Sequence, residues 1–202
     1  LDHERSVESE ELVLVLDISG SMADYSRMVL HFVHAVANRK GQGWARVHAF
    51  TFGTRLTNVT RHLRHRDVDV ALARVASAVE AWAGGTRIGA TIAEFNRHWS
   101  RRLLGQNAVV LLISDGLDAE SGAGLDEAMG RLSKSCKRLV WLNPLLRWDG
   151  FSPRARGIRA ILPHVDAFRT CHNLASLEDL AMALSGPADA GELDRIRRLV
   201  AS

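Results

Sequence analysis

The stretch LVLVLDISGSM, residues 12–22, decides the fold class of this chain. Its first five residues are apolar at every position, which is typical of a parallel strand buried on both faces. Asp17 ends this run, and apolar residues then recur at helical spacing over residues 22–40. A second run of the same kind, AVVLLIS at residues 108–114, is also closed by an aspartate, Asp115. The two stretches together indicate an α/β fold with a buried parallel sheet.

The rest of the chain alternates strand and helix patterns. Besides the two apolar runs, strands are expected at residues 44–52, 55–60, 138–143 and 166–170, and helices at 67–83, 88–104, 124–136, 153–162 and 176–185. The turn at residues 53–54 makes the strand at 55–60 an antiparallel hairpin partner at the sheet edge. The order predicts a doubly wound, mostly parallel, six-stranded Rossmann-like sheet with one antiparallel edge strand and helices on both faces.

The 202 residues divide into three expected parts. Residues 1–11 carry five acids and one arginine and are expected to form a solvated arm or the end of a linker. Residues 12–186 are expected to form one α/β domain, and residues 187–202 an additional amphipathic helix. Because the chain starts with Leu1 and no signal peptide opens it, we expect a piece of a longer protein.

Composition excludes several classes of protein. Two cysteines are too few for a disulfide scaffold, and no CxxC pair is present for zinc, which favours a reducing compartment. The longest apolar runs fall far short of the ~20 residues that a membrane span needs. The net charge of +3 is too small to indicate a nucleic-acid partner by itself.

Three loops carry oxygen-bearing side chains at positions where open α/β sheets bind ligands. Asp17, Ser19 and Ser21 follow the first strand, Thr86 lies in a Gly-Gly-Thr loop between two helices, and Asp115 follows the second apolar run. Two carboxylates and three hydroxyls form a hard-oxygen set, which selects Mg²⁺, Mn²⁺ or Ca²⁺ over zinc or copper. Alternate residues of a tight Asp-x-Ser-x-Ser turn can face one point, and Ser21 is also expected to cap the helix that follows.

In their order and separations, LVLVLDISGSM, GGTRIG and VVLLISDG resemble the von Willebrand factor A domain with its metal-ion-dependent adhesion site. The family pattern of Asp-x-Ser-x-Ser with a later Thr and a later Asp falls on Asp17, Ser19, Ser21, Thr86 and Asp115. The resemblance implies that the three hydroxyl residues are direct or near-direct ligands and that the two aspartates act largely through water. It also implies that an acidic side chain of a partner completes the coordination.

A narrower resemblance adds expectations about partners. Met22, the GGTRIG loop and the late stretch from WLNPL to HNLASLEDLAMAL are similar to the bacterial CoxE-like branch, over residues 12–185. This branch implies a cytoplasmic protein that pairs with a MoxR-type AAA+ ATPase. It further implies a chaperone-like role in the maturation of a metalloenzyme such as a carbon monoxide dehydrogenase. The acidic side chain at the metal then belongs to the ATPase or to the client enzyme.

The residues favour a binding module without catalysis, because the site holds no general base and the chain has neither a GxSxG nor a GxxxxGK[ST] motif. One alternative is a Mg²⁺-dependent phosphatase or phosphotransfer enzyme in which Asp17 accepts the phosphoryl group. Its machinery is incomplete, since Ser19 stands where such enzymes usually carry a second acid. Another alternative is RNA binding by the basic stretch Arg55–Arg66. Because no aromatic residues are interleaved with its arginines, a protein contact or a sheet edge protected by charge explains this stretch better.

Two further residues are expected to contact a partner. Trp148 lies in a loop after a predicted strand, where an exposed aromatic ring can anchor a protein surface. Arg87 directly follows Thr86 in the second loop of the predicted metal site.

Overall fold

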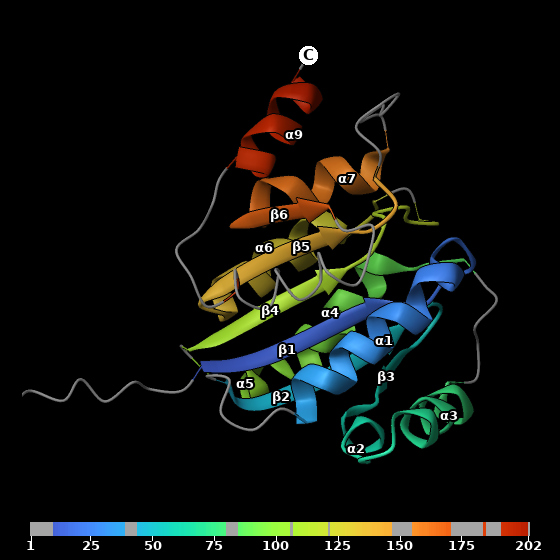
Figure 1. The fold of residues 1–202 in the computed structure, drawn as a ribbon. Coiled ribbons are helices and arrows are strands. Elements are labelled where there is room, and N and C mark those ends of the chain that lie inside the picture. Colours follow the sequence, from blue (N-terminus) through green and yellow to red (C-terminus); the bar gives the residue numbers. More distant parts are fainter. Residues whose placement is uncertain are drawn as a thin grey trace, which may run out of the picture.

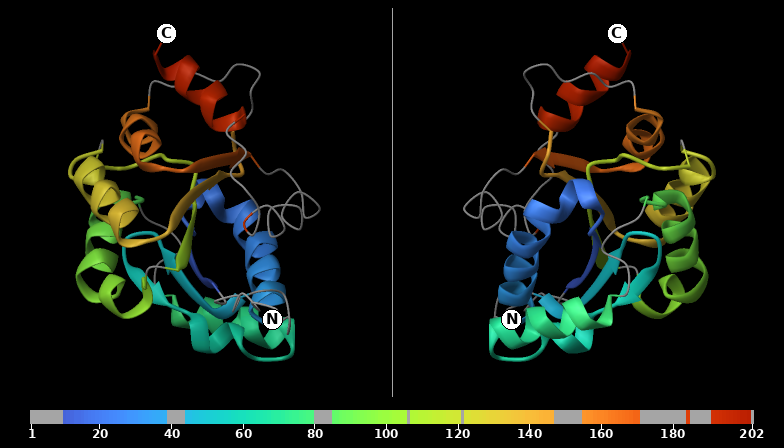
Figure 2. Two further views of the ribbon diagram at one scale, coloured as in Figure 1. Left: turned by 90° about the vertical axis from the view of Figure 1, so that its left-hand side faces the viewer. Right: turned by 90° about the vertical axis from the view of Figure 1, so that its right-hand side faces the viewer.

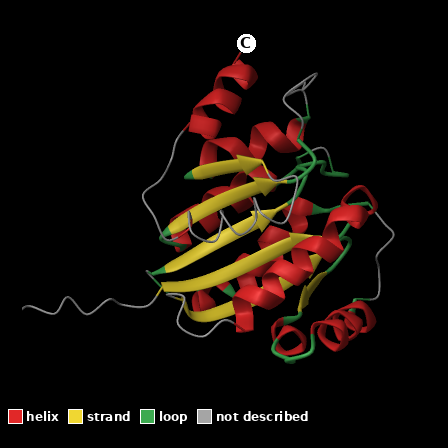
Figure 3. Cartoon of the chain, viewed as in Figure 1, coloured by secondary structure: helices red, strands yellow, loops and turns green. Residues whose placement is uncertain are grey.

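A central six-stranded sheet organises the chain in the computed structural model (Figure 1), which describes residues 10–38, 44–79, 85–105, 107–120, 122–146, 155–170, 184 and 191–201. The strand order is β3-β2-β1-β4-β5-β6. Neighbouring strands pair parallel except β3, which pairs antiparallel with β2 at the sheet edge (Figure 3). The predicted doubly wound, mostly parallel sheet with one antiparallel edge strand is confirmed.

The described strands and helices have the following bounds. The strands are β1 (Glu10–Asp17), β2 (Trp44–Phe52), β3 (Leu56–Asn58), β4 (Ala108–Ile113), β5 (Arg138–Asn143) and β6 (Ala167–Thr170). The helices are η1 (Gly20–Met22), α1 (Ala23–Asn38), α2 (Thr60–Leu63), α3 (Val68–Ala78), α4 (Ile88–His98), α5 (Ser100–Leu103), α6 (Leu125–Ser135), α7 (Arg156–Ile161), η2 (Leu162–His164) and α9 (Gly191–Ala201). None of these described helices is both long enough and apolar enough to cross a membrane.

Alternate side chains of the central strands enter two separate hydrophobic clusters. In β1, Leu14 and Leu16 pack into the cluster beneath α1 and α3, whereas Val13 and Val15 pack into the cluster beneath α4 and α6. Each of these side chains is at most 2% exposed. The run is therefore apolar at every position because both faces of the strand are covered.

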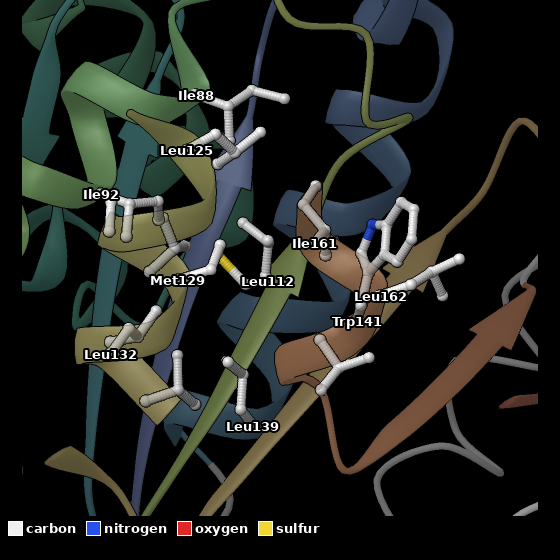
Figure 4. Close-up of a cluster of buried hydrophobic side chains, with 14 of the residues drawn as sticks. Ile88, Ile92, Leu112, Leu125, Met129, Leu132, Leu139, Trp141, Ile161 and Leu162 are labelled. Carbon is white, nitrogen blue, oxygen red and sulfur yellow. The ribbon is translucent and has the colours of Figure 1, made fainter. Parts of the chain in front are cut away.

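Helices cover both faces of the sheet (Figure 2). On the α4 and α6 side, Met129 of α6 lies beside Leu112 of β4, whereas Trp141 of β5 lies beneath α7 (Figure 4). This layer also includes Ile161 of α7. The packing matters for the site because α6 and α7 flank the loop that follows β4.

The helix expected at residues 88–104 is interrupted at Trp99, so it forms two helices, α4 and α5. Trp99 has non-helical backbone angles of −120° and −32° for φ and ψ. Its ring packs edge-on against Phe50 of β2, with 5.1 Å between the ring centroids. The apolar periodicity continues through the break, which explains why it predicted a single helix.

The strand expected at residues 55–60 is shorter than predicted, and a helix not expected from the sequence follows it. Asn58 accepts a hydrogen bond from the backbone N–H of Thr60 through its side-chain oxygen, which turns the chain out of the sheet. The hydroxyl of Thr60 bonds the backbone of Ala49, and Leu63 is fully buried. These contacts stabilise α2 within the basic stretch Arg55–Arg66, directly after the edge strand.

The ends of the expected domain also differ from the sequence boundaries. β1 begins at Glu10 rather than at Leu12, so the last two residues of the expected acidic arm belong to the sheet. The C-terminal helix α9 docks on the domain, because Leu193 and Ile196 are buried in the same cluster as α4 and α6. The helix expected at residues 176–185 lies outside the described residues apart from Leu184.

Gly157 of α7 lies in very close contact with the loop that follows β4. A Cβ atom at this position would lie 2.1 Å from the carbonyl oxygen of Gly116, whereas a Cβ at Gly105 would meet no atom within 4 Å. We therefore expect Gly157→Ala to lower the free energy of unfolding by about 1–3 kcal/mol, as overpacking does. Gly105→Ala should change it by less than about 0.5 kcal/mol. Urea denaturation followed by circular dichroism measures both, and equal stability of the two variants would contradict this contact.

Candidate metal site

Backbone hydrogen bonds join the three predicted loops at the carboxyl edge of the sheet. The N–H of Ile18 donates to the carbonyl of Phe52 at 2.8 Å, and the N–H of Arg87 donates to the carbonyl of Gly53 at 3.2 Å. The N–H of Ala119 donates to the carbonyl of Thr86 at 2.8 Å. Loops from distant parts of the sequence therefore form one continuous surface.

The first loop folds around the carboxylate of Asp17. Oδ1 of Asp17 accepts a hydrogen bond of 2.9 Å from the backbone N–H of Ser19, and the hydroxyl oxygens of Ser19 and Ser21 lie 3.2 Å apart. Asp17 and Ser19 are buried, whereas Ser21 is exposed. The sequence pattern thus brings one carboxylate and two hydroxyls together.

The expected capping role of Ser21 is wrong. The chain enters the helical region through the 3-10 turn η1, whose N-cap residue is Ser19, and no side chain makes a capping hydrogen bond there. The Asp17 carboxylate takes the N–H of Ser19, and the hydroxyl of Ser21 lies beside that of Ser19 instead. Both serine hydroxyls are therefore available as ligands.

Ser114 connects the first loop to the third. Its hydroxyl donates to Oδ2 of Asp17 at 2.8 Å and accepts from the N–H of Gly116 at 3.1 Å. Oδ1 of Asp115 accepts from the N–H of Leu117 at 2.9 Å. The sequence analysis placed Ser114 in this loop but gave it no role. The position of its hydroxyl, directly before Asp115 at the end of a buried strand, could have indicated one.

Asp118 holds the second loop in place and was missed by the sequence analysis. Its carboxylate accepts from the N–H of Ile88 at 3.0 Å and from the N–H of Gly122 at 2.8 Å. It thereby satisfies the first turn of α4 from another loop, as an N-cap residue would. Thr86 lies two residues before Ile88, is 6% exposed, and accepts the hydrogen bond from Ala119 through its carbonyl, so the loop of Asp118 contacts it on both sides.

Burial dominates the electrostatics of the site. The pKa of Asp17 is raised from its usual 3.8 to about 6, because burial and, to a smaller extent, the charge of Asp115 outweigh the hydrogen bonds from Ser19 and Ser114 that lower it. Two carboxylates at the same buried edge repel each other when both are ionised. The site therefore favours a positive charge between them.

The residues present fit a divalent cation. Within the described part of the chain, Oδ2 of Asp115 is buried and has no hydrogen-bond partner, which is rare for a buried carboxylate oxygen. No three His, Cys, Asp or Glu side chains of the described residues cluster as a metal site. The oxygen atoms that meet at this edge are carboxylates and hydroxyls, and such a set suits a hard cation.

The two predicted partner contacts have different outcomes. Arg87 lies at the rim of the site, with its Nε 3.6 Å from Oε1 of Glu120, and its side chain is 59% exposed. Trp148 lies outside the described residues. The structure thus places Arg87 beside the candidate metal site and leaves its contact with a partner as a prediction.

The sheet order and the carboxylate and hydroxyl loops at its carboxyl edge define the class of protein, a von Willebrand factor A (VWA) domain. The model of the family described as VWA domain containing CoxE-like protein matches residues 1–177. The chain belongs to this family, and the resemblance inferred from the sequence is confirmed. A comparison with curated proteins gives no match.

Solved structures with low sequence identity share the fold. A von Willebrand factor type A protein from Catenulispora acidiphila aligns with a TM-score of 0.60 and 20% identity, over 88% of this chain and 42% of that one. Manganese-loaded TRAP protein from Plasmodium vivax aligns with a TM-score of 0.57 and 20% identity, over 90% of this chain and 73% of that one. Proximal thread matrix protein 1 from the mussel byssus, with a zinc-occupied MIDAS motif, aligns with a TM-score of 0.57 and 14% identity. The alignment covers 88% of this chain and 48% of the mussel protein. This chain spans about half the length of the mussel protein.

The raised pKa of Asp17 predicts how stability depends on pH without metal. The folded protein holds this proton more tightly than the unfolded chain, so the stabilising contribution is complete below about pH 4 and is lost as pH rises through about 6. We expect the free energy of unfolding of the wild-type protein, relative to Asp17→Asn, to fall by about 2–2.5 kcal/mol from pH 4 to pH 7. Urea denaturation in chelator measures this difference. Parallel pH profiles for the two proteins would show that Asp17 is not desolvated.

Proposed function

We propose that this chain is a metal-dependent protein-binding module with no catalysis of its own. The observation that carries the proposal is the buried, unpartnered Oδ2 of Asp115 at the edge where Asp17 and the serine hydroxyls converge. A cation bound there keeps room for an outside oxygen ligand, because hard cations such as Mg²⁺ retain exchangeable water. An Asp or Glu side chain of a partner protein supplies that ligand.

The proposed ligand set is the one expected from the sequence. Ser19, Ser21 and Thr86 bind the cation through their hydroxyls, and Asp17 and Asp115 hold its hydrated side. Mg²⁺ is proposed first, with Mn²⁺ and Ca²⁺ as alternatives, because every proposed ligand is an oxygen. The manganese and zinc in the two similar structures support a divalent cation and place zinc in the test panel.

The contacts of Asp17 favour binding over phosphotransfer. A nucleophilic carboxylate needs an oxygen that substrate can reach. The side chain of Asp17 is 0% exposed, and its two oxygens accept hydrogen bonds from the N–H of Ser19 and the hydroxyl of Ser114. Asp17 is therefore placed to orient a cation and its water.

We further propose that the partner is a MoxR-type AAA+ ATPase or its client metalloenzyme, in a cytoplasmic maturation step. Membership of the CoxE-like family supports this proposal. The chain supplies the metal-dependent contact, and the energy of ATP hydrolysis is supplied by the partner. RNA binding by Arg55–Arg66 is not proposed, because α2 places part of this stretch on a helix without aromatic residues.

The rim of the site offers an apolar contact for such a partner. Leu117 is 53% exposed, the highest exposure among the large apolar residues that the structure describes. Its backbone N–H is held by Asp115, so its place beside the candidate metal is set by the site itself. We propose that Leu117 and Arg87 contact residues next to the partner's acidic side chain.

Metal binding predicts a thermal shift that depends on Asp17. At a metal concentration about a hundredfold above its Kd, the folded state gains about 2.7 kcal/mol. For a domain of this size we expect Tm to rise by about 5–10 °C. Asp17→Ala should abolish the rise, and Asp69→Ala, an exposed aspartate of α3, should keep it. Differential scanning fluorimetry with Mg²⁺, Mn²⁺, Ca²⁺ and Zn²⁺ against chelator measures this, and a wild-type melt that no metal changes would refute the proposal.

The proposed partner contact predicts that substitutions at Leu117 and at Asp17 have different effects. Pull-down of the MoxR-type ATPase of the native host should succeed in Mg²⁺ and fail in chelator or with Asp17→Ala. Leu117→Ser should weaken capture about tenfold or more, as loss of a buried apolar contact does, while it retains the metal-induced rise in Tm. Leu199→Ser, at an exposed leucine of α9, is the matched control and should bind like wild type. Capture that is equally strong in chelator would contradict the role of the metal.

A further inference from the structure

A groove between α2 and α3 carries positive charge and an apolar wall. Its volume is about 870 Å³, which lies within the ~300–1,000 Å³ of ligand clefts. None of the five candidate metal-site residues lines it. The described lining residues are Arg61, His62, Val70, Ala73, Arg74, Ser77 and Ala78.

The inner side of this helix pair is firmly attached to the domain. Leu63 of α2 and Val75 of α3 are fully buried in the cluster beneath α1. Nε2 of His34 in α1 lies 2.7 Å from the carbonyl oxygen of His65, and the side chain of Asn38 donates to the carbonyl of Leu63 at 2.8 Å. α2 and α3 lie side by side (Figure 1), and these contacts hold both helices on the domain.

The groove has positive charge that the described part of the chain does not neutralise. Arg61 and Arg74 are exposed, and no ion pair joins either of them to an acid among the described residues. None of the lining residues that the structure describes is acidic. Burial, followed by the charges of Arg61 and Arg74, lowers the pKa of His62, so the two guanidinium groups supply the charge at neutral pH.

The apolar part of the groove favours a polypeptide over a nucleic acid. Val70, which is 39% exposed, is one of the three exposed large apolar residues in the described part of the chain, and Ala73 also lines the groove. Among the described residues that line the groove there is no aromatic side chain on which a nucleic-acid base would stack. Carboxylates form paired hydrogen bonds with guanidinium groups, and an aliphatic side chain fits against Val70.

We propose that the α2–α3 groove binds an acidic polypeptide segment of a partner protein, with carboxylates on Arg61 and Arg74 and an apolar side chain against Val70. This contact is independent of the metal. It gives the module a second docking site, and two linked contacts raise affinity without a new contact at either site.

Fluorescence anisotropy with short labelled peptides tests the proposal on the full chain. The probes are a Glu-Glu-Leu repeat, a Glu-Glu-Gly repeat and an oligo(U) RNA of equal charge. All measurements are made in chelator, so that binding of a glutamate at the metal site does not contribute. A failure here leaves the metal-dependent thermal shift untouched, which keeps the two proposals separable.

The variants separate a specific groove from general charge attraction. Arg61→Glu combined with Arg74→Glu should weaken binding of the Glu-Glu-Leu peptide about tenfold or more, with steep dependence on salt. The matched control, Arg27→Glu combined with Arg101→Glu at exposed positions of α1 and α5, should bind like wild type. Val70→Ser should weaken the Glu-Glu-Leu peptide severalfold and leave the Glu-Glu-Gly peptide unchanged.

Three outcomes would overturn the proposal. These are no binding of the Glu-Glu-Leu peptide by the wild-type chain, an equal loss in the control pair, and tighter binding of oligo(U) that the groove variants abolish. Melting curves of all variants verify folding, which the substitutions should preserve because they alter exposed side chains.

Discussion

The parallel pairing of β1 with β4 is the constraint on which the site depends. Leu16 lies opposite Ile113 in this pairing, so both strands end at the same level of the sheet. The residues that follow, Asp17 and Ser114, then meet in a hydrogen bond of 2.8 Å. A shift of either strand by one residue would move every side chain to the opposite face of the sheet and would separate Asp17 from Ser114. The register that forms the core therefore also brings the two aspartates together.

This placement carries a cost for stability in the absence of metal. A buried carboxylate that is only partly compensated destabilises the folded state when it is ionised, and the pKa of Asp17 is raised accordingly. The tight contact between Gly157 and Gly116 and the capping contacts of Asp118 hold the loops despite this repulsion. A rigid edge with two carboxylates and free hydroxyls is suited to a cation that is coordinated in part by another protein.

The sequence predicted most of the fold because its local signals agreed with the tertiary environment. The continuous apolar runs at β1 and β4 were sufficient to identify buried parallel strands, and the Gly53–Thr54 turn identified the antiparallel edge. The predictions failed where a long-range contact overrides local periodicity. The helix breaks at Trp99 because its ring packs on Phe50, and α2 forms because Thr60 bonds the backbone of Ala49.

The same division holds for the site. By itself the sequence indicated the candidate oxygen ligands, since Asp17, Ser19 and Ser21 lie within one turn and carry the oxygen groups that hard cations prefer. Only the tertiary structure decided which groups support them. Ser114 bonds Asp17, 97 positions away in the sequence, and Asp118 bonds Ile88, 30 positions away. No local sequence pattern indicates hydrogen bonds between residues so far apart. The pKa of Asp17 likewise follows from burial beneath packed helices, which is a property of the assembled fold and not of the motif.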